Sequence, residues 1–277
     1  MGETQGQPYD WNGATGETWV ENQALLDAMF APVRDRLIAC VPEGADEAVL
    51  DIGCGTGATS LALAERMGDG GHVTGLDISE PMIARARERA EGRANLTFLA
   101  DDAATHDFGD ARFDRLVSRF GVMFFDDPVA AFAHLRDSTK PGGTMHFITW
   151  REPKDNPFMT ASGRAAREFF PDMPGYDPDA PGQFGLADPA RIEPVFANAG
   201  WQGVTVTPLD IACAFPRADL DIFIRRVGPV ARLMGDMEDA QREQIVESIR
   251  PAFDPFIDGD EVRYMAGCWM IEGRNSG

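Results

Sequence analysis

The sequence predicts an α/β protein whose mostly parallel, seven-stranded sheet has helices on both faces and an inserted helical cap. Three observations support this fold. Short apolar runs alternate five times with helical or polar stretches between residues 48 and 150, and the connections are short. After residue 150 a Pro/Gly/Asp-rich loop appears, and an acidic helical stretch follows it. Regular alternation is typical of a parallel sheet covered by helices, and the later segments predict the cap.

The first elements are expected near the N-terminus. Apolar residues recur at helical spacing over residues 18–40, and Pro42-Glu43-Gly44 ends that helix. Residues 48–53 form a short apolar run that stops in glycine, as buried parallel strands do. A helix over residues 58–67 and a second strand over residues 72–77 follow. The chain therefore enters the sheet within its first 50 residues.

The next elements continue the alternation. Ser79 and Pro81 open a helix as its N-cap and its early proline. Three more strands are predicted, and one helix lies between the last two. The strands are residues 96–100, 113–118 and 143–150, and the helix is residues 129–138.

The segments after residue 150 are less regular. The loop over residues 171–185 contains four prolines, and loops of this length are commonly functional lids or disordered links. The other segments are helical over residues 158–170, 188–199 and 217–256, and strand-like over residues 203–215 and 262–272.

Composition excludes several classes of protein. The 277 residues carry 45 acidic and 25 basic side chains, a net charge of −20, which disfavours nucleic-acid binding. We expect a cytoplasmic protein, because the N-terminus has no secretory pattern and no apolar stretch is long enough to span a membrane. The four cysteines form no CxxC pair, so neither a disulfide framework nor a metal site is expected.

The clearest motif is Val-Leu-Asp-Ile-Gly-Cys-Gly-Thr-Gly over residues 49–57. Gly53, Gly55 and Gly57 follow a strand and precede a helix, where glycine permits sharp turns and close approach of a ligand. A purely structural tight turn is the alternative. Asp77 lies 20 residues after the last glycine, at the end of the second strand, where a carboxylate can accept hydrogen bonds from ribose hydroxyls.

Nicotinamide enzymes share that acid but use GxGxxG, whereas this loop is GxGxG preceded by Asp51. A further carboxylate beside the loop repels a pyrophosphate and attracts an ammonium or sulfonium group. The sequence as a whole resembles the Rossmann-like class I S-adenosylmethionine-dependent methyltransferases, most of all the small-molecule branch related to the quinone C-methyltransferases. Five segments carry the resemblance in the family's order: residues 49–57, 75–79, 100–103, 113–119 and 140–143.

The resemblance implies S-adenosyl-L-methionine as the cofactor and assigns a role to particular residues. The glycine loop would hold the methionine end, with Asp51 acting on its ammonium side. Asp77 would hold the ribose, Ile78 would pack on adenine, and Asp102, with Asp101 as its rival, would accept from the adenine amino group. The implied cofactor-binding set is Asp51, Gly53, Cys54, Gly55, Gly57, Asp77, Ile78, Met82, Asp102, Ala103, Ser118, Arg119 and Trp19.

Trp11 and Trp19 precede the first strand and are candidates to fold over the cofactor, because aromatic rings attract a sulfonium. The alternative for Trp19 is the apolar face of the first helix. We expect one methyltransferase domain over residues 1–277. It has an N-terminal helical lid (1–44), a cofactor-binding core (45–150) and substrate cap insertions (151–187 and 216–256).

The catalytic residues stay unassigned. His106, His134, His146 and the pair Asp126 and Asp127 are candidate bases, but none is well placed, and His146 lies in mid-strand, as a core histidine would. Methyl transfer can depend on positioning and desolvation, and a base is needed only if the acceptor enters protonated.

The expected substrate pocket is formed by Phe120, Phe124, Trp150 and Arg151, at the carboxyl ends of the fourth and fifth strands. Arg119 and Arg151 raise the question of an anionic acceptor, with internal salt bridges as the alternative. The cap would line this pocket with five apolar side chains. These are Phe158, Phe169, Phe170, Phe223 and Ile224.

The leading hypothesis is a methyltransferase that acts at O, C, N or S of a small, partly apolar acceptor, with aromatic and carboxylate-bearing compounds as candidates. A nicotinamide-dependent oxidoreductase on the same kind of sheet is one alternative, and a non-catalytic S-adenosylmethionine-binding protein is another. We expect no nucleic-acid partner, no membrane span, and a monomer or homodimer.

Overall fold

The computed structural model describes residues 9–109, 113–173, 175–235 and 237–277. Residues 1–8 of the expected N-terminal lid lie outside this range. Eight strands form one sheet. They are β1 (Ala48–Ile52), β2 (His72–Asp77), β3 (Leu96–Ala100), β4 (Phe113–Arg119), β5 (Thr139–Trp150), β6 (Gln202–Pro216), β7 (Ile257–Asp258) and β8 (Glu261–Arg274).

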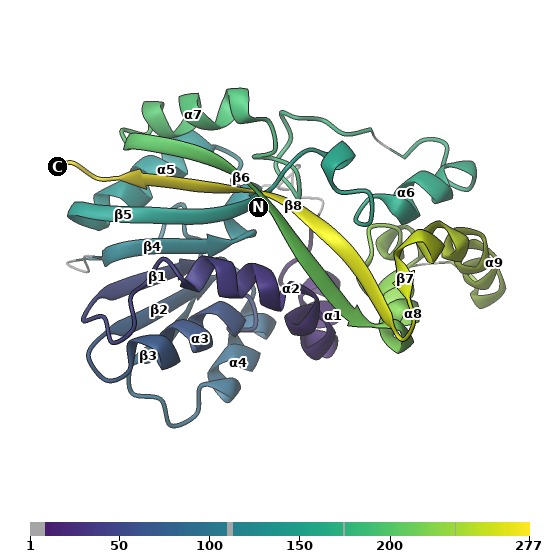
Figure 1. Ribbon diagram of the computed structural model, residues 1–277, viewed down its shortest axis with the longest axis horizontal. Helices are drawn as coiled ribbons and strands as arrows, with labels where there is room; N and C mark the ends of the chain where they lie inside the picture. The colour runs from purple at the N-terminus through teal and green to yellow at the C-terminus, as the bar shows by residue number, and fades with distance from the viewer. Residues whose placement is uncertain (1–8, 110–112, 174, 236) are drawn as a thin grey trace, which may run out of the picture.

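The strand order is β3-β2-β1-β4-β5-β8-β6, with β7 paired to β8 (Figure 1). Strands β1 to β5 are parallel to one another, whereas β8 is antiparallel to β5 and to β6. The predicted α/β fold with a mostly parallel sheet is confirmed. Strand β7 was missed, because two residues are too short for any periodicity.

Nine α-helices accompany the sheet in the described part of the chain. They are α1 (Ala14–Glu21), α2 (Gln23–Ile38), α3 (Ala58–Met67), α4 (Glu80–Arg89), α5 (Pro128–Asp137), α6 (Ala161–Ala165), α7 (Pro189–Asn198), α8 (Leu220–Ile222) and α9 (Asp239–Ile249). Shorter 3₁₀ turns are η1 (Gly121–Phe124), η2 (Pro153–Asp155), η3 (Ala166–Glu168), η4 (Arg217–Asp219), η6 (Ala231–Met234) and η7 (Arg250–Phe256), and η5 (Phe223–Val227) is a π-helix.

Two predicted helices need correction. The single helix over residues 18–40 is two helices, α1 and α2, which meet at Asn22. The Asn22 side-chain amide donates to the Thr18 carbonyl at 2.8 Å, and such local bonds compete with a continuing helix. The long helical stretch over residues 217–256 is a series of short helices, because Gly228, Pro229 and Pro251 interrupt it.

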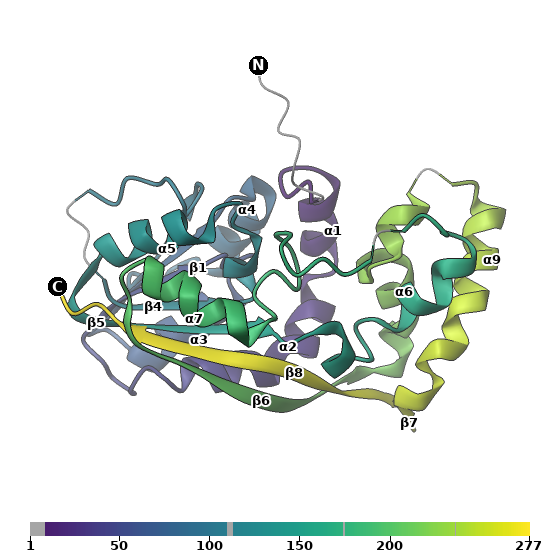
Figure 2. The ribbon, with the colours of Figure 1, turned by 90° about the horizontal axis from the view of Figure 1, so that it is seen from above.

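Helices cover both faces of the sheet. Helices α2 and α3 pack together on one face, while α5 and α7 pack together on the other (Figure 2). On the second face, Phe132, Phe147 and Phe196 contact one another and are fully buried. This aromatic cluster packs α5 and α7 against β5.

A long antiparallel ribbon extends the sheet toward the described residues of the predicted cap, 151–173, 175–187, 216–235 and 237–256 (Figure 1). Pairing between β5 and β8 ends at Trp150 and Cys268, but β8 continues beside β6 as far as Glu261. The Tyr264 hydroxyl, on this ribbon, donates to the Met29 carbonyl in α2 at 3.0 Å. This hydrogen bond connects the ribbon to α2.

No helix in the described residues is long and apolar enough to cross a membrane. Within the same residues, no group of three or more His, Cys, Asp or Glu side chains could hold a metal ion.

Candidate functional site

A cavity of about 920 Å³ lies at the carboxyl edge of the parallel strands, where ligands of open α/β sheets bind. The ends of β1, β2, β4 and β5, helices α1 and α2, and the cap all line it. Many predicted site residues meet here, namely Trp19, Gly53, Cys54, Gly55, Asp77, Ile78, Met82, Asp102, Ala103, Arg119, Phe120, Phe124 and Trp150. The other four, Asp51, Gly57, Ser118 and Arg151, do not line it.

The glycine loop turns sharply between β1 and α3. Gly53 and Gly55 have φ values of +65° and +56°, which L side chains rarely adopt. A Cβ on Gly53 would lie 2.5 Å from the Gly121 Cα, so this loop and the turn after β4 touch backbone to backbone. Gly121 was not singled out from the sequence, because the contact joins residues 68 positions apart.

Gly57 packs closely against neighbouring side chains. It precedes α3 with φ +86°, and a Cβ there would lie 2.8 Å from the Phe98 ring and 3.1 Å from the Ala86 Cβ. This glycine lets α4 and β3 approach the loop. Because Gly57 lies outside the cavity lining, its position does not support the predicted contact with the cofactor.

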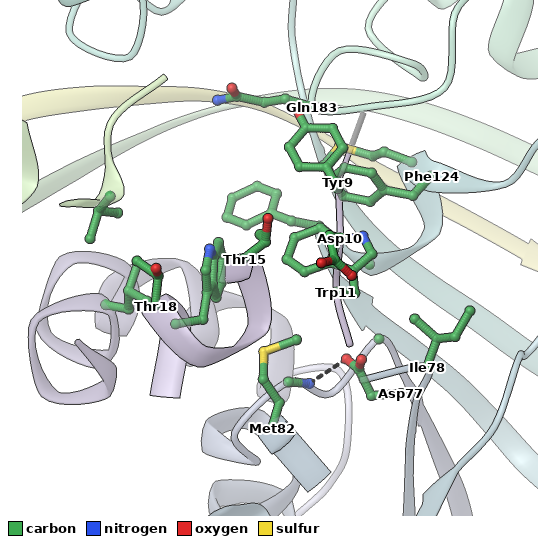
Figure 3. A pocket seen from close by; sticks show the side chains of 18 of the residues that line it. Tyr9, Asp10, Trp11, Thr15, Thr18, Asp77, Ile78, Met82, Phe124 and Gln183 are labelled. Atoms are coloured by element: carbon green, nitrogen blue, oxygen red, sulfur yellow. Dashed lines mark hydrogen bonds between the residues drawn. The ribbon is translucent and has the colours of Figure 1, made fainter. Parts of the chain in front are cut away.

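Asp77 lies at the end of β2 with its carboxylate at the cavity (Figure 3). The Gly55 N–H donates to one oxygen at 2.8 Å, and the Ser79 N–H donates to the other at 2.9 Å. Burial raises the pKa of Asp77, and the two N–H groups act in the opposite direction. The carboxylate is thus held at a fixed angle, and each oxygen keeps acceptor capacity for a ligand.

Beside Asp77 the cavity wall is apolar. Ile78 is 40% exposed although it is large and hydrophobic, and both Ile78 and Met82 line the cavity, on opposite sides of Asp77 in Figure 3. Asp102 lines the wall, and its carboxylate accepts from the Ala104 N–H at 2.9 Å. Its rival Asp101 lies outside the lining and pairs with His106 at 2.7 Å. These positions favour Asp102.

Asp51 and Ser118 lie behind the loop. The Ser60 hydroxyl donates to the Asp51 carboxylate at 2.6 Å, and burial raises the pKa of Asp51 to about 7. The Ser118 hydroxyl donates to the Ile52 carbonyl at 2.7 Å and accepts from the Gly121 N–H at 3.2 Å. Ser118 therefore fixes the end of β4 against the end of β1.

The segment before α1 closes one side of the cavity. The Ser79 hydroxyl donates to the Trp11 carbonyl at 2.6 Å, and the Glu80 N–H donates to the Asn12 side chain at 2.8 Å. Both contacts attach this segment to the start of α4. Trp11 meets the rings of Trp19 and Phe124 edge to face, at centroid distances of 5.8 and 5.4 Å. Aromatic side chains thus face Asp77 across the cavity (Figure 3).

A second aromatic wall follows β4 and β5. The Phe120 and Trp150 rings stack at 4.3 Å with an interplanar angle of 4°, and Phe30 contacts both edge to face. Phe120 has φ +68°, the only left-handed non-glycine residue in the described chain. A bulky residue in this region is strained by about 1–3 kcal/mol, and such outliers cluster at functional sites.

The arginines at the strand ends differ. Arg119 lines the cavity, whereas Arg151 pairs with Asp210 at 2.8 Å and with Asp155 at 3.7 Å, and lies over the Trp269 ring. The expectation that Arg151 forms a pocket wall is therefore corrected: its partners lie on the ribbon and in the turn after β5, so the salt-bridge alternative describes it.

The cap contributes mainly through η5 and the turn after it. Phe223, Val227, Gly228 and Pro229 line the cavity. Of the other predicted cap residues, Phe158, Phe169, Phe170 and Ile224 do not line it; Phe158 and Ile224 are buried in the core instead.

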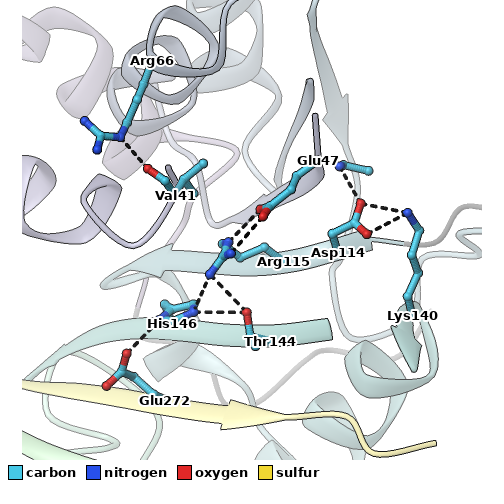
Figure 4. A network of polar contacts seen from close by, with 10 residues as sticks. Val41, Glu47, Arg66, Asp114, Arg115, Lys140, Thr144, His146 and Glu272 are labelled. Carbon is cyan, nitrogen blue, oxygen red and sulfur yellow. Dashed lines mark hydrogen bonds and ion pairs between the residues drawn. The ribbon is translucent and has the colours of Figure 1, made fainter. Parts of the chain in front are cut away.

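None of the four histidines lines the cavity. His106 pairs with Asp101, and the His134 ring contacts the His106 carbonyl. His146 lies between Arg115 and Glu272 in a polar network across the strands (Figure 4). Asp126 and Asp127 do reach the cavity, but both are exposed and Asp127 caps α5. The cavity thus offers no buried histidine base.

Comparison with known proteins identifies a matching family and similar structures. Residues 49–143 match the profile of a methyltransferase domain. The aklanonic acid methyltransferase DauC of Streptomyces sp. (strain C5) is 38% identical over 122 residues, which are 43% of this chain and 56% of that protein. A demethylmenaquinone methyltransferase of Beutenbergia cavernae is 31% identical over 172 residues, 57% of this chain and 67% of that protein.

The crystal structure of YcgJ from Bacillus subtilis superimposes with a TM-score of 0.57 over 88% of this chain and 98% of that chain, at 18% identity. A likeness at that identity concerns the fold alone. This chain spans about half the length of the first curated relatives that it matches, 56% in the case of DauC.

Proposed function

The chain belongs to the S-adenosylmethionine-dependent methyltransferases, and from that premise we propose that it methylates a small, partly apolar acceptor at O, C, N or S. The observation that carries the proposal is a single cavity of about 920 Å³ that joins the glycine loop and Asp77 to two aromatic walls. A binding site for cofactor and acceptor together needs such a continuous space.

The residues present fit the cofactor. Asp77 offers its oxygens to ribose hydroxyls, Ile78 offers an exposed apolar face to adenine, and Gly53 and Gly55 leave the loop backbone accessible. When bound, S-adenosylmethionine supplies an activated methyl group on a cationic sulfur. Asp102 and Ala103 would border the adenine, and Trp11 and Trp19 would cover the site as part of the N-terminal lid.

The chain's own residues would act by positioning and by excluding water. The aromatic walls and the cap make the cavity more apolar than polar, which favours desolvation of the reacting groups. With no histidine in the lining, the acceptor would enter in its reactive protonation state or would lose its proton to water or to a lining carboxylate such as Asp126 or Asp127. We infer no catalytic residue.

The acceptor is proposed to be flat or aromatic, because the parallel Phe120 and Trp150 rings and the Phe30 edge provide a stacking wall. Two relatives are named for aklanonic acid and demethylmenaquinone, which supports an organic small molecule. The net charge of −20 argues against a nucleic-acid substrate. We further propose that the chain works as a monomer or homodimer.

Transfer of labelled methyl groups tests the proposal. The protein is incubated with methyl-labelled S-adenosylmethionine and a panel of phenols, quinols, carboxylic acids, amines and thiols, and label is sought in the products. We expect transfer to at least one aromatic member. Cofactor binding without transfer to any member would favour a non-catalytic binding protein.

Cofactor affinity is expected to depend on pH through Asp51. Its pKa of about 7 in the free protein means that the carboxyl is about half protonated at neutral pH. If the cofactor's ammonium group lies near it, binding favours the ionised form, so the complex releases a proton. Below pH 7, S-adenosylhomocysteine affinity should fall by up to tenfold per pH unit, and above pH 8 it should level off.

Calorimetry in two buffers of different ionisation enthalpy measures this proton release. Asp51→Asn should abolish it. Binding of 5′-methylthioadenosine, which lacks the amino acid end, should not depend on Asp51 ionisation. Equal proton release with both ligands would contradict the role proposed for Asp51.

A further inference from the structure

Arg119 is a cation at the cavity, and few nearby groups compensate its positive charge. The structure gives its guanidinium one hydrogen bond, to the Phe30 carbonyl at 3.4 Å, and no ion pair among the described residues. The Phe30 ring lies below it, 5.6 Å from the guanidinium carbon. A guanidinium has five N–H donors, so several remain for a ligand.

Neighbouring carboxylates compensate this charge only in part. Asp27 also lines the cavity, but it accepts from Arg89 at 2.6 Å and from Gln23 at 2.5 Å. Asp51 is buried beside Ser60, and its raised pKa leaves it only partly ionised at neutral pH. Burial lowers the pKa of Arg119, while Asp27 and Asp51 act in the opposite direction. An arginine nevertheless keeps its proton in proteins.

Other arginines of this region are already paired. Arg225 contacts both oxygens of Glu243, at 2.8 and 2.9 Å, and Arg226 pairs with Glu21. Arg242 pairs with Asp239 at 2.8 Å, and Arg151 with Asp210. Their charges are balanced within the protein. Arg119 differs because it has no ion pair among the described residues, and a partly buried guanidinium is costly unless a ligand supplies the counter-charge.

We propose that Arg119 is a carboxylate-binding residue of the cavity. A planar guanidinium matches a carboxylate through paired N–H donors, which the compact ammonium of lysine cannot reproduce. Two sources can supply this group: the methionine end of the cofactor, or an acceptor acid lying against the Phe30, Phe120 and Trp150 rings. The inference rests on the proposed function, because it concerns the same cavity.

Calorimetry with wild type, Arg119→Gln and Arg119→Lys tests the proposal. The ligands are S-adenosylhomocysteine, which has a carboxylate, and 5′-methylthioadenosine, which has none. If the cofactor is the source, Arg119→Gln should bind S-adenosylhomocysteine on the order of 10- to 100-fold more weakly and 5′-methylthioadenosine unchanged. Arg119→Lys should recover part of the loss, because it restores charge without the paired donors.

The second arm addresses the acceptor. Salicylate and its neutral counterpart salicylamide are titrated into protein saturated with S-adenosylhomocysteine. If the acceptor is the source, Arg119→Gln binds both nucleoside ligands as wild type does but loses the preference of wild type for salicylate over salicylamide. Arg151→Gln is the matched control, since it removes a paired arginine outside the cavity and should leave all four affinities unchanged.

The outcomes separate the two proposals. If wild type binds S-adenosylhomocysteine and Arg119→Gln matches it for all four ligands, Arg119 binds no carboxylate and this inference is wrong, while the proposed function stands. If wild type binds neither nucleoside ligand, the proposed function fails and this inference fails with it. Thermal unfolding of each variant identifies any loss of affinity that follows from misfolding. If Arg119→Gln misfolds, the affinities of Arg119→Lys decide between these outcomes.

Discussion

Replacing Asp77 by alanine is expected to weaken S-adenosylhomocysteine binding on the order of 100-fold or more. The carboxylate is positioned to accept from two ribose hydroxyls, and a hydrogen bond to a charged group contributes about 1.5–3 kcal/mol. The substitution also releases the Gly55 and Ser79 N–H groups, which Asp77 holds at 2.8 and 2.9 Å. The glycine loop would then lose the contact that orients it.

Calorimetry separates these two effects when variants are compared. Asp77→Asn keeps the shape and one acceptor oxygen, so its loss should be smaller than that of Asp77→Ala. Asp101→Asn is the control: that acid also follows a strand of the same sheet, but it pairs with His106 outside the cavity and should change affinity less than about twofold. Unchanged binding by Asp77→Ala would remove the assigned cofactor site.

Much of the fold and part of the site were predictable from the sequence because their signals are local. The strand β1, the glycine loop and Asp77 lie within about 30 residues, and the alternation around them predicts a parallel sheet. Helix α3 and strands β2 and β3 begin and end at the predicted residues. Local periodicity and turn chemistry are sufficient there.

Most of the remainder depended on contacts between distant residues. Arg151 was expected at the pocket, but its partner Asp210 lies on β6, a pairing that no local pattern indicates. Phe120 was expected as a wall, but no local pattern indicated its stack on Trp150, 30 residues away, or its left-handed backbone. The break at Asn22 was missed because apolar periodicity does not reveal a local side-chain bond such as the one from Asn22 to the Thr18 carbonyl. Tertiary contacts account for the positions of Arg151 and of the Phe120 ring, whereas the break at Asn22 is local.

Gly121→Ala is expected to destabilise the protein although Gly121 has no left-handed backbone. A Cβ there would lie 2.5 Å from the Ile52 carbonyl oxygen and 2.7 Å from the Gly53 Cα. Both obstacles are backbone atoms at the end of β1, so relief requires β1 and β4 to separate. Overpacking of this kind costs about 1–3 kcal/mol, and at this chain length each 1 kcal/mol lowers Tm by about 2–4 °C.

The same movement would displace Gly53, which lines the cavity, so Gly121→Ala should also weaken S-adenosylhomocysteine binding. Gly163→Ala is the matched control, because a Cβ at Gly163 in α6 meets no atom within 4 Å. Alanine there should leave binding unchanged and stabilise the protein by up to about 1 kcal/mol through helix propensity. Thermal unfolding and calorimetry on both variants provide the comparison. If Gly121→Ala unfolds at the wild-type temperature, the ends of β1 and β4 can separate freely. The close contact between the glycine loop and the turn after β4 would then not be what shapes the cofactor loop.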